Sequence, residues 1–502
     1  MRKQRLFTDS SKIAVIVWSV FQSRQHFFKA YGLIEYALDF VFNVGLILLS
    51  TTLYADSPIQ FGLMLLVPCL FLYLLRKPTI KESRPWTKRT DKIDIVPLPD
   101  YPLKPFLTTY RGCMMVITCI AILAVDFRIF PRRFAKTENW GTSLMDLGVG
   151  SFVFSAGLVA ARPILKESIS RPRSLARRLQ ESFQHSVPLL VLGFIRLWSL
   201  KGLDYAEHVT EYGVHWNFFF TLAFVPPFVA LFQSIYNYIP SYALLSILLG
   251  SAYEVALNFT DLKAFILVGP RVDLFSQNRE GIFSFFGYLA IFLAGQALGM
   301  VVIPRRAVHT GPGDGWTQRM KLLITLLIWT AIWTALYRLT TSYSYGLNIQ
   351  VSRRLANLPY FLWVAAFNTA QLTAFCGIET LFFPAFYQAT DKVEEDRAYI
   401  FATSRVLAAY NKNGLAIFLV ANLLTGAVNL LLPTLRMNHI QAITTLLAYT
   451  GVLTIFALTL HEYNITLKMP GGGGRVRAAT KSVARTQVGS RSGSDTVKRT
   501  KS

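Results

Sequence analysis

The chain has 502 residues, of which 53% are hydrophobic and only 16% are charged. Soluble domains usually carry about 25% charged residues, so this composition excludes a soluble globular enzyme, a disordered chain and a coiled coil. The net charge of +23 lies in short loops between apolar blocks and in the C-terminal tail, so we expect a lipid bilayer and no nucleic acid as partner.

Long apolar blocks predict membrane-spanning helices, because a span needs about 20 mostly apolar residues. The blocks are continuous rather than alternating, which favours helices over a β-barrel. Together with a short first block, Ile13–Phe21, they predict an all-α, multi-pass transmembrane bundle of about 12 or 13 spans. The other expected spans are Leu33–Tyr54, Ile59–Leu75, Phe106–Val125, Leu144–Leu165, Val187–Leu200, Trp216–Tyr236, Tyr242–Leu257, Ile282–Val302, Leu322–Leu339, Leu358–Phe383, Leu415–Leu432 and Ile443–Leu460.

The distribution of Lys and Arg predicts the orientation. Thirteen spans would put the basic segments Arg76–Lys92, Lys166–Arg178 and Arg475–Lys501 on one side, which we assign to the cytosol. The N-terminus then faces the lumen and the C-terminus the cytosol. We expect one membrane domain over 1–468 and a basic, disordered tail over 469–502.

Four cysteines lie in apolar surroundings, and their spacing is not that of metal ligands. Neither a disulfide scaffold nor a metal site is indicated. These residues are Cys69, Cys113, Cys119 and Cys376.

The first polar cluster follows the apolar run that ends at Asp126. Pro131 should turn the chain so that Arg132, Arg133 and Lys136 fold back toward Asp126. A carboxylate kept ionised by a nearby ammonium group can act as a general base. A boundary pair that only fixes helix depth is the structural alternative.

Asp146 lies near the start of the next span, with glycines at positions 148 and 150. Its carboxylate could bind a substrate hydroxyl, cap the helix or pair with a neighbouring span.

The stretch from Asp204 to Asn217 is the densest polar run outside the basic loops. Helical spacing places His208 near Glu211, and a His with a carboxylate partner can serve as a general base. His215 and Asn217 end the run. A solvated interfacial loop is the alternative.

Two adjacent arginines, Arg353 and Arg354, precede another span. Arginines around a cavity suit phosphate, which guanidinium binds through two parallel hydrogen bonds. They could equally anchor helix ends at the membrane boundary. Asn422 and Asn429 share one face of a span and more readily tie helices together than touch substrate. No nucleophile motif is present, which favours direct transfer with a general base over a covalent intermediate.

At these motifs the sequence resembles the inositol acyltransferases of glycosylphosphatidylinositol (GPI) anchor biosynthesis, the fungal GPI-anchored wall transfer protein family. The resemblance runs from about residue 34 to residue 460 and is carried by long stretches in one order. These are Ile122–Lys136, Trp140–Phe154, Glu207–Phe219, Asn278–Phe285 and Val351–Tyr360.

The resemblance implies an acyltransferase of the endoplasmic reticulum membrane. The family moves a fatty acyl group, typically palmitoyl from palmitoyl-CoA, to the inositol ring of glucosaminyl-phosphatidylinositol; acyl-CoA is a co-substrate, and no cofactor is expected. The GPI pathway supplies anchored mannoproteins to the fungal cell wall, and fungal members of the family are antifungal targets. Asp126 and Lys136 match the catalytic pair. The expected substrate-binding residues are Arg132, Arg133, Asp146, His208, Glu211, His215, Asn217, Arg353 and Arg354.

Three other functions fit the composition alone. A lipid transporter or flippase would move its substrate without chemical change and usually has repeated halves, which we do not find. A membrane scaffold would catalyse nothing. An O-acyltransferase of the His/Asn type would need a paired motif that is not evident in this sequence.

Overall fold

The computed structural model describes residues 2–75, 99–167, 174–200, 209–304, 314–389 and 391–467. Within these residues the chain forms helices and no strands, which confirms the predicted all-α, multi-pass bundle. The α-helices are α1 (Arg2–Gln25), α2 (Leu33–Phe40), α3 (Leu46–Thr51), α4 (Pro58–Leu75), α5 (Pro105–Ala124), α6 (Leu144–Glu167), α7 (Leu175–Leu200), α8 (Val209–Tyr212), α9 (Phe218–Ile235), α10 (Tyr242–Phe259), α11 (Leu262–Val268), α12 (Leu274–Gln277), α13 (Arg279–Val302), α14 (Asp314–Thr341), α15 (Leu358–Phe382), α16 (Lys392–Phe401), α17 (Arg405–Lys412), α18 (Gly414–Leu431) and α19 (His439–Glu462). A π-helix, η2 (Val41–Gly45), joins α2 to α3, and short 3₁₀ helices are η1 (Phe27–Lys29), η3 (Arg132–Phe134), η4 (Pro384–Gln388) and η5 (Thr434–Arg436).

Eleven helices of the described residues are long and apolar enough to cross a membrane. They coincide with all the predicted spans except Ile13–Phe21 and Val187–Leu200. Those two blocks fall in α1 and α7, which contain 24 and 26 residues. Both helices are therefore long enough for a span but more polar than the other eleven.

Helix α1 extends past the predicted first block, through Gln22 to Gln25. Gln22 is buried, its Nε2 donates to the Phe401 carbonyl at 3.1 Å, and its Oε1 accepts from the Phe28 N–H at 3.0 Å. The bundle tolerates this polar side chain because both ends of its amide are hydrogen-bonded.

The most extensive helix contact joins α6 and α13. A Cβ at Gly157 would meet the Phe292 carbonyl, and a Cβ at Gly295 would meet the Phe154 carbonyl. The two backbones therefore touch at glycines, as expected for tightly packed membrane helices. Because later residues of α6 contact later residues of α13, the two helices run parallel and begin at the same end of the bundle.

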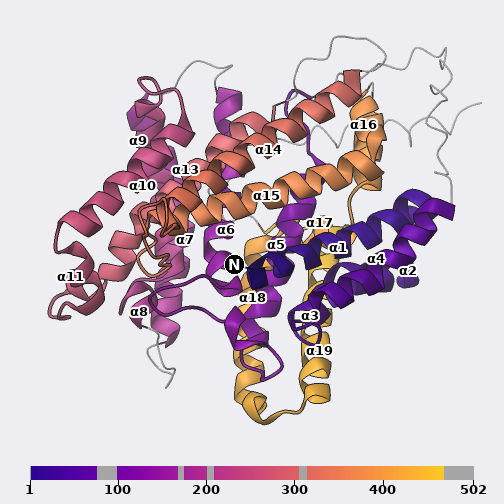
Figure 1. Cartoon of the computed structure of the whole chain (residues 1–502), viewed down its shortest axis with the longest axis horizontal. Coiled ribbons are helices and arrows are strands. Elements are labelled where there is room, and N and C mark those ends of the chain that lie inside the picture. Colours follow the sequence, from indigo (N-terminus) through magenta and orange to yellow (C-terminus); the bar gives the residue numbers. More distant parts are fainter. Residues whose placement is uncertain are drawn as a thin grey trace, which may run out of the picture. The chain divides into compact units, whose positions relative to one another are not determined.

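The loops at this end, which we call the site end, are tied to one another. The Gly141 N–H donates to the Val351 carbonyl at 2.8 Å, and the Val214 N–H donates to the Gln277 carbonyl at 3.0 Å. In Figure 1, α14 lies beside α15, and α18 and α19 form a hairpin. Most of the predicted site residues lie in the site-end segments 125–143, 209–217 and 342–357.

Several predictions concern residues outside the described ranges. The basic segment Arg76–Lys92, the pair Arg171 and Arg173, and the predicted tail 469–502 belong there. The described bundle lies in the compact unit Met1–Leu467. All four cysteines are described, buried and free.

Candidate functional site

Asp126 lies in a turn that follows the last residue of α5. Its N–H donates to the Leu123 carbonyl at 3.1 Å, so the helical path continues for part of a turn. Phe127 and Phe130 next to it are fully buried and anchor the turn in the core. The buried apolar neighbours therefore fix the backbone position of Asp126, while the residue itself is only half-buried.

The Asp126 carboxylate has one direct partner among the described residues. Asn429 Nδ2, on α18, donates to Asp126 Oδ2 at 2.8 Å, and Oδ1 accepts no hydrogen bond from this part of the chain. Burial raises the pKa of Asp126, whereas the Asn429 hydrogen bond and the positive charge of Arg132 act in the opposite direction. Arg132 folds back as predicted and donates to the Val125 carbonyl at 2.9 Å.

Lys136 contacts a different carboxylate from the one that its spacing suggested. Its Nζ donates to both oxygens of Glu211 at 2.9 Å, and no hydrogen bond joins it to Asp126. The two predicted catalytic residues therefore lie in the same loop after α5 but have different partners, Asn429 for Asp126 and Glu211 for Lys136. Glu211, from the polar run, replaces Asp126 as the anion beside Lys136.

Glu211 connects Lys136 to two further charged groups. Arg353 Nη1 donates to Glu211 at 2.9 Å, and Arg353 Nε donates to Asp146 Oδ1 at 2.9 Å. We call Lys136, Glu211, Arg353 and Asp146 the Lys136 network. Asp146 is fully buried and Arg353 is 6% exposed, whereas the Lys136 side chain is 45% exposed, so the network leads from the core to the surface.

Charge within the network shifts the pKa of its two central groups. Burial alone would raise the pKa of Glu211, but Arg353 and Lys136 outweigh burial and hold it below its ordinary value. For Arg353, burial acts to lower the pKa, and Glu211 reverses this effect and raises it. Both side chains therefore stay ionised at neutral pH.

Asp146 is saturated by protein donors. Besides Arg353, its carboxylate accepts from the Thr137 hydroxyl at 2.9 Å and the Ser143 hydroxyl at 2.8 Å. The Tyr360 hydroxyl donates to its backbone carbonyl at 2.8 Å. Of the predicted alternatives, these contacts match a helix-start residue that pairs with a neighbouring span.

Arg354 belongs to a second buried cluster. It donates to Asn139 Oδ1 at 2.8 Å and to Glu280 Oε1 at 2.9 Å, and Glu280 also pairs with Arg271. Arg279 donates to the carbonyls of Ile266 and Pro270. Arg353 and Arg354 are both less than a tenth exposed and committed to carboxylates, so their guanidinium groups do not form an open phosphate site.

Three further predicted residues come from the polar run that ends at Asn217. Asn217 is the N-cap of α9, and its Oδ1 accepts from the Phe219 and Phe220 N–H groups. The backbone N–H of His215 donates to Asn278 at 2.8 Å, and its side chain is half-buried. His208 lies outside the described residues.

Arg132 and Arg133, like Lys136, are exposed cations of the site end. Arg133 pairs with Asp56 at 2.6 Å, and the Asp56 side chain is 85% exposed. An exposed pair of this kind is weak, so a phosphate can displace it at little cost.

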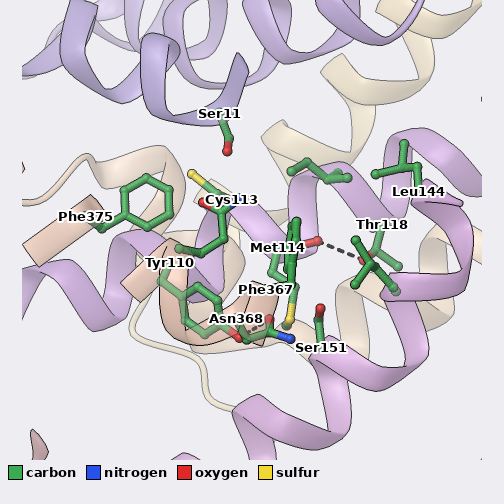
Figure 2. Close-up of a pocket in the computed structure, with 14 residues that line it drawn as sticks. Ser11, Tyr110, Cys113, Met114, Thr118, Leu144, Ser151, Phe367, Asn368 and Phe375 are labelled. Carbon is green, nitrogen blue, oxygen red and sulfur yellow. Dashed lines mark hydrogen bonds between the residues drawn. The ribbon is translucent and has the colours of Figure 1, made fainter. Parts of the chain in front are cut away.

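An apolar cavity of about 60 Å³ lies between α5, α6 and α15. Figure 2 shows Ser11 of α1 facing it from one side and the hydrogen-bonded pair Tyr110–Asn368 from another. The cavity is less than half the size of the roughly 150 Å³ apolar cavity that takes up benzene. It therefore suits water or a few carbon atoms, and it contains no member of the Lys136 network.

Within the described ranges, no three His, Cys, Asp or Glu side chains come together as a metal site would require. The sequence indicates that Asn429 ties helices together, but it does not identify Asn429 as the partner of Asp126 or Glu280 as the partner of Arg354. Their only signal is that each is a polar residue near the end of an apolar span.

Comparison with known proteins gives one consistent family. The family model described as GWT1 matches residues 4–460. The chain is similar to GPI-anchored wall transfer protein 1 of Gibberella zeae, with 56% identity over 477 residues that cover 92% of this chain and 94% of that protein. The Aspergillus fumigatus protein of the same name is 55% identical over 91% of this chain and 93% of its own length. The Candida albicans protein of the same name is 39% identical over 88% of this chain and 91% of its own length.

Proposed function

Since the chain belongs to the GWT1 family of GPI-anchored wall transfer proteins, it has a role in GPI-anchor biosynthesis, and we propose that this role is acyl transfer. The donor is a fatty acyl-CoA such as palmitoyl-CoA, and the acceptor is an inositol hydroxyl of glucosaminyl-phosphatidylinositol. The observation that carries the proposal is the half-buried Asp126 carboxylate, which has one oxygen bonded and the other available. It shares its loop with the Lys136 ammonium group.

Asp126 is the general base of the proposed reaction. Its free Oδ1 takes the proton of the inositol hydroxyl as the hydroxyl oxygen attacks the thioester carbonyl carbon. The C–S bond then breaks, the ester forms, and the proton passes from Asp126 to the CoA thiolate. Atoms and charge balance without a cofactor, and the carboxylate returns to its starting state.

Lys136 stabilises the oxyanion of the tetrahedral intermediate. Two of its three N–H bonds point to Glu211, which leaves one donor for the thioester oxygen. A fixed ammonium group acts on charge that develops in the transition state, the kind of contribution that speeds the chemical step. Glu211, Arg353 and Asp146 hold it there, so we assign them positioning roles.

The lipid phosphate binds Arg132 and Arg133, whose side chains are accessible at the site end. Arg354 supports the loop through Asn139, and His215 and Asn217 shape the neighbouring segment. The acyl chains lie along the apolar faces of the spans, where each buried methylene contributes about 0.8 kcal/mol. The proposal places the protein in the endoplasmic reticulum membrane, with the site end and the N-terminus in the lumen and the C-terminus in the cytosol.

The test is an assay in microsomes from cells that lack the endogenous enzyme. Labelled palmitoyl-CoA and glucosaminyl-phosphatidylinositol are added to wild type, to Asp126→Asn and to empty microsomes. An alkali-labile acyl group on the inositol ring, made by wild type only, supports the reaction and the base. Equal product from wild type and Asp126→Asn would move the base elsewhere. No product from well-expressed wild type, together with lipid movement across the bilayer, would favour the transporter.

A further inference from the structure

Asn429 connects the candidate base to a helix far away in the sequence. It lies in the last turn of α18, 303 residues after Asp126, and its Nδ2 donates to Asp126 Oδ2 at 2.8 Å. Asn422, seven residues earlier, instead donates to the Phe418 carbonyl of its own helix at 2.7 Å. The two asparagines share a helix face, but only Asn429 contacts a carboxylate.

The helices that carry this contact are held to each other by a buried hydroxyl group. Tyr449 of α19 is 4% exposed, and its hydroxyl lies 2.9 Å from the Cys119 carbonyl of α5 and 3.4 Å from the Ala421 carbonyl of α18. One tyrosine thus contacts both helices about two turns from Asp126 and Asn429. The Tyr449 contacts hold α5 and α18 at a fixed spacing, and this spacing keeps the Asn429 amide next to the Asp126 carboxylate. A chance contact between two surface side chains would have no such support.

We propose that Asn429 is a positioning residue for Asp126, which holds one carboxylate oxygen so that the other points to the acceptor hydroxyl. This inference rests on the proposed function. A donated hydrogen bond restricts the rotation of the carboxylate and favours its ionised form. Among the described residues, Arg132 is the charged group that acts on Asp126, and the facing helix α18 supplies the neutral amide of Asn429.

The sign of the expected effect follows from the role of a base. Removal of the Asn429 amide takes away a bond to the ionised carboxylate, so the pKa of Asp126 rises. A larger share of Asp126 is then protonated at low pH and cannot accept the substrate proton. The loss of activity should be greatest at low pH and should shrink as pH rises.

The experiment measures kcat and KM for acyl transfer across pH in microsomes for wild type, Asn429→Ala, Asn429→Gln, Asn422→Ala and Asp126→Asn. We expect kcat of Asn429→Ala to fall about tenfold at neutral pH, which is the usual size of a lost hydrogen bond to a charged group. Its KM should be unchanged, and the acid limb of its kcat profile should move to higher pH. Asn429→Gln keeps the donor and should recover part of the rate, and Asn422→Ala should match wild type.

The outcomes separate this inference from the proposed function. An inactive Asp126→Asn beside an Asn429→Ala protein with a normal profile would overturn the positioning role alone. A loss of equal size at every pH, or the same loss in Asn422→Ala, would assign Asn429 a packing role instead. Full activity of Asp126→Asn would overturn the base itself. If Asn429→Ala fails to accumulate in the membrane, Asn429→Leu replaces it as the variant without a donor, and an unshifted acid limb with reduced kcat in Asn429→Leu contradicts the inference.

Discussion

Arg353 and Asp146 are 207 residues apart in the chain, yet the Arg353 Nε donates to Asp146 Oδ1 at 2.9 Å in a site where the carboxylate is fully buried. The same guanidinium bonds Glu211 at 2.9 Å. One arginine thus joins the start of α6, the segment before α9 and the segment before α15. The same cluster includes Lys136, because Lys136 donates to the Glu211 carboxylate that Arg353 also bonds.

Arg353→Ala should destabilise the protein strongly, because it leaves Asp146 as a buried carboxylate without its cation. Removal of one partner of a buried pair usually costs about 3–5 kcal/mol. Thermal unfolding of the detergent-purified protein measures the loss. Arg177→Ala is the matched control, since the exposed Arg177–Glu181 pair on α7 should contribute no more than about 0.5 kcal/mol. Equal losses in the two variants would contradict the structural role of the network.

Glu211→Gln tests the network through pH. The pKa of Glu211 is lowered in the folded protein, so its ionised form contributes stability that is present above the ordinary value of 4.5 and is lost as pH falls below it. At pH 7 the variant should therefore be less stable than wild type, by about 1.5–3 kcal/mol for bonds to charged groups. Below pH 4.5 the two unfolding curves should converge. A difference that stays constant down to pH 3 would show that Glu211 is not the titrating group.

The membrane spans could be predicted from the sequence because the bilayer sets a simple requirement. About 20 apolar residues must follow one another, and any block that meets this requirement forms a helix. The predicted block Phe106–Val125 differs from α5 by one residue at each end, and Leu358–Phe383 differs from α15 by one residue at its C-terminal end. Gln22 shows the limit of the same argument, since its buried amide is bonded by residues that hydropathy does not reveal.

The partners within the site could not be predicted, because hydropathy does not say which helices are neighbours. The spacing of Asp126 and Lys136 suggested one ion pair, but the fold brings Glu211 and Asn429 to them from distant helices. Arg353 and Arg354 looked alike in sequence as candidates for phosphate. The structure gives each its own buried carboxylate, Asp146 and Glu280, and this pairing depends on long-range packing.

Arg132→Ala should weaken binding of the lipid substrate. Its guanidinium is exposed at the site end, where a phosphate can reach it, and one charge-assisted contact typically gives about a tenfold change in affinity. We expect KM for glucosaminyl-phosphatidylinositol to rise about tenfold, while KM for acyl-CoA stays constant. Arg436→Ala, an exposed arginine of η5 at the same end, should leave both values unchanged. A KM increase for acyl-CoA alone would assign Arg132 to the other substrate.

Gly157→Ala should disturb the site from within the bundle. A Cβ at this position would meet the Phe292 carbonyl of α13, so α6 and α13 must separate. Overpacking of this kind usually costs about 1–3 kcal/mol. Because Asp146 lies in the first turn of α6 and Glu280 in the first turn of α13, activity should fall together with the unfolding temperature. Gly451→Ala is the control, since nothing lies within 4 Å of a Cβ there; the better helix propensity of Ala should leave that variant as stable as wild type or more so. A stable, fully active Gly157→Ala would mean that α6 and α13 need no backbone contact.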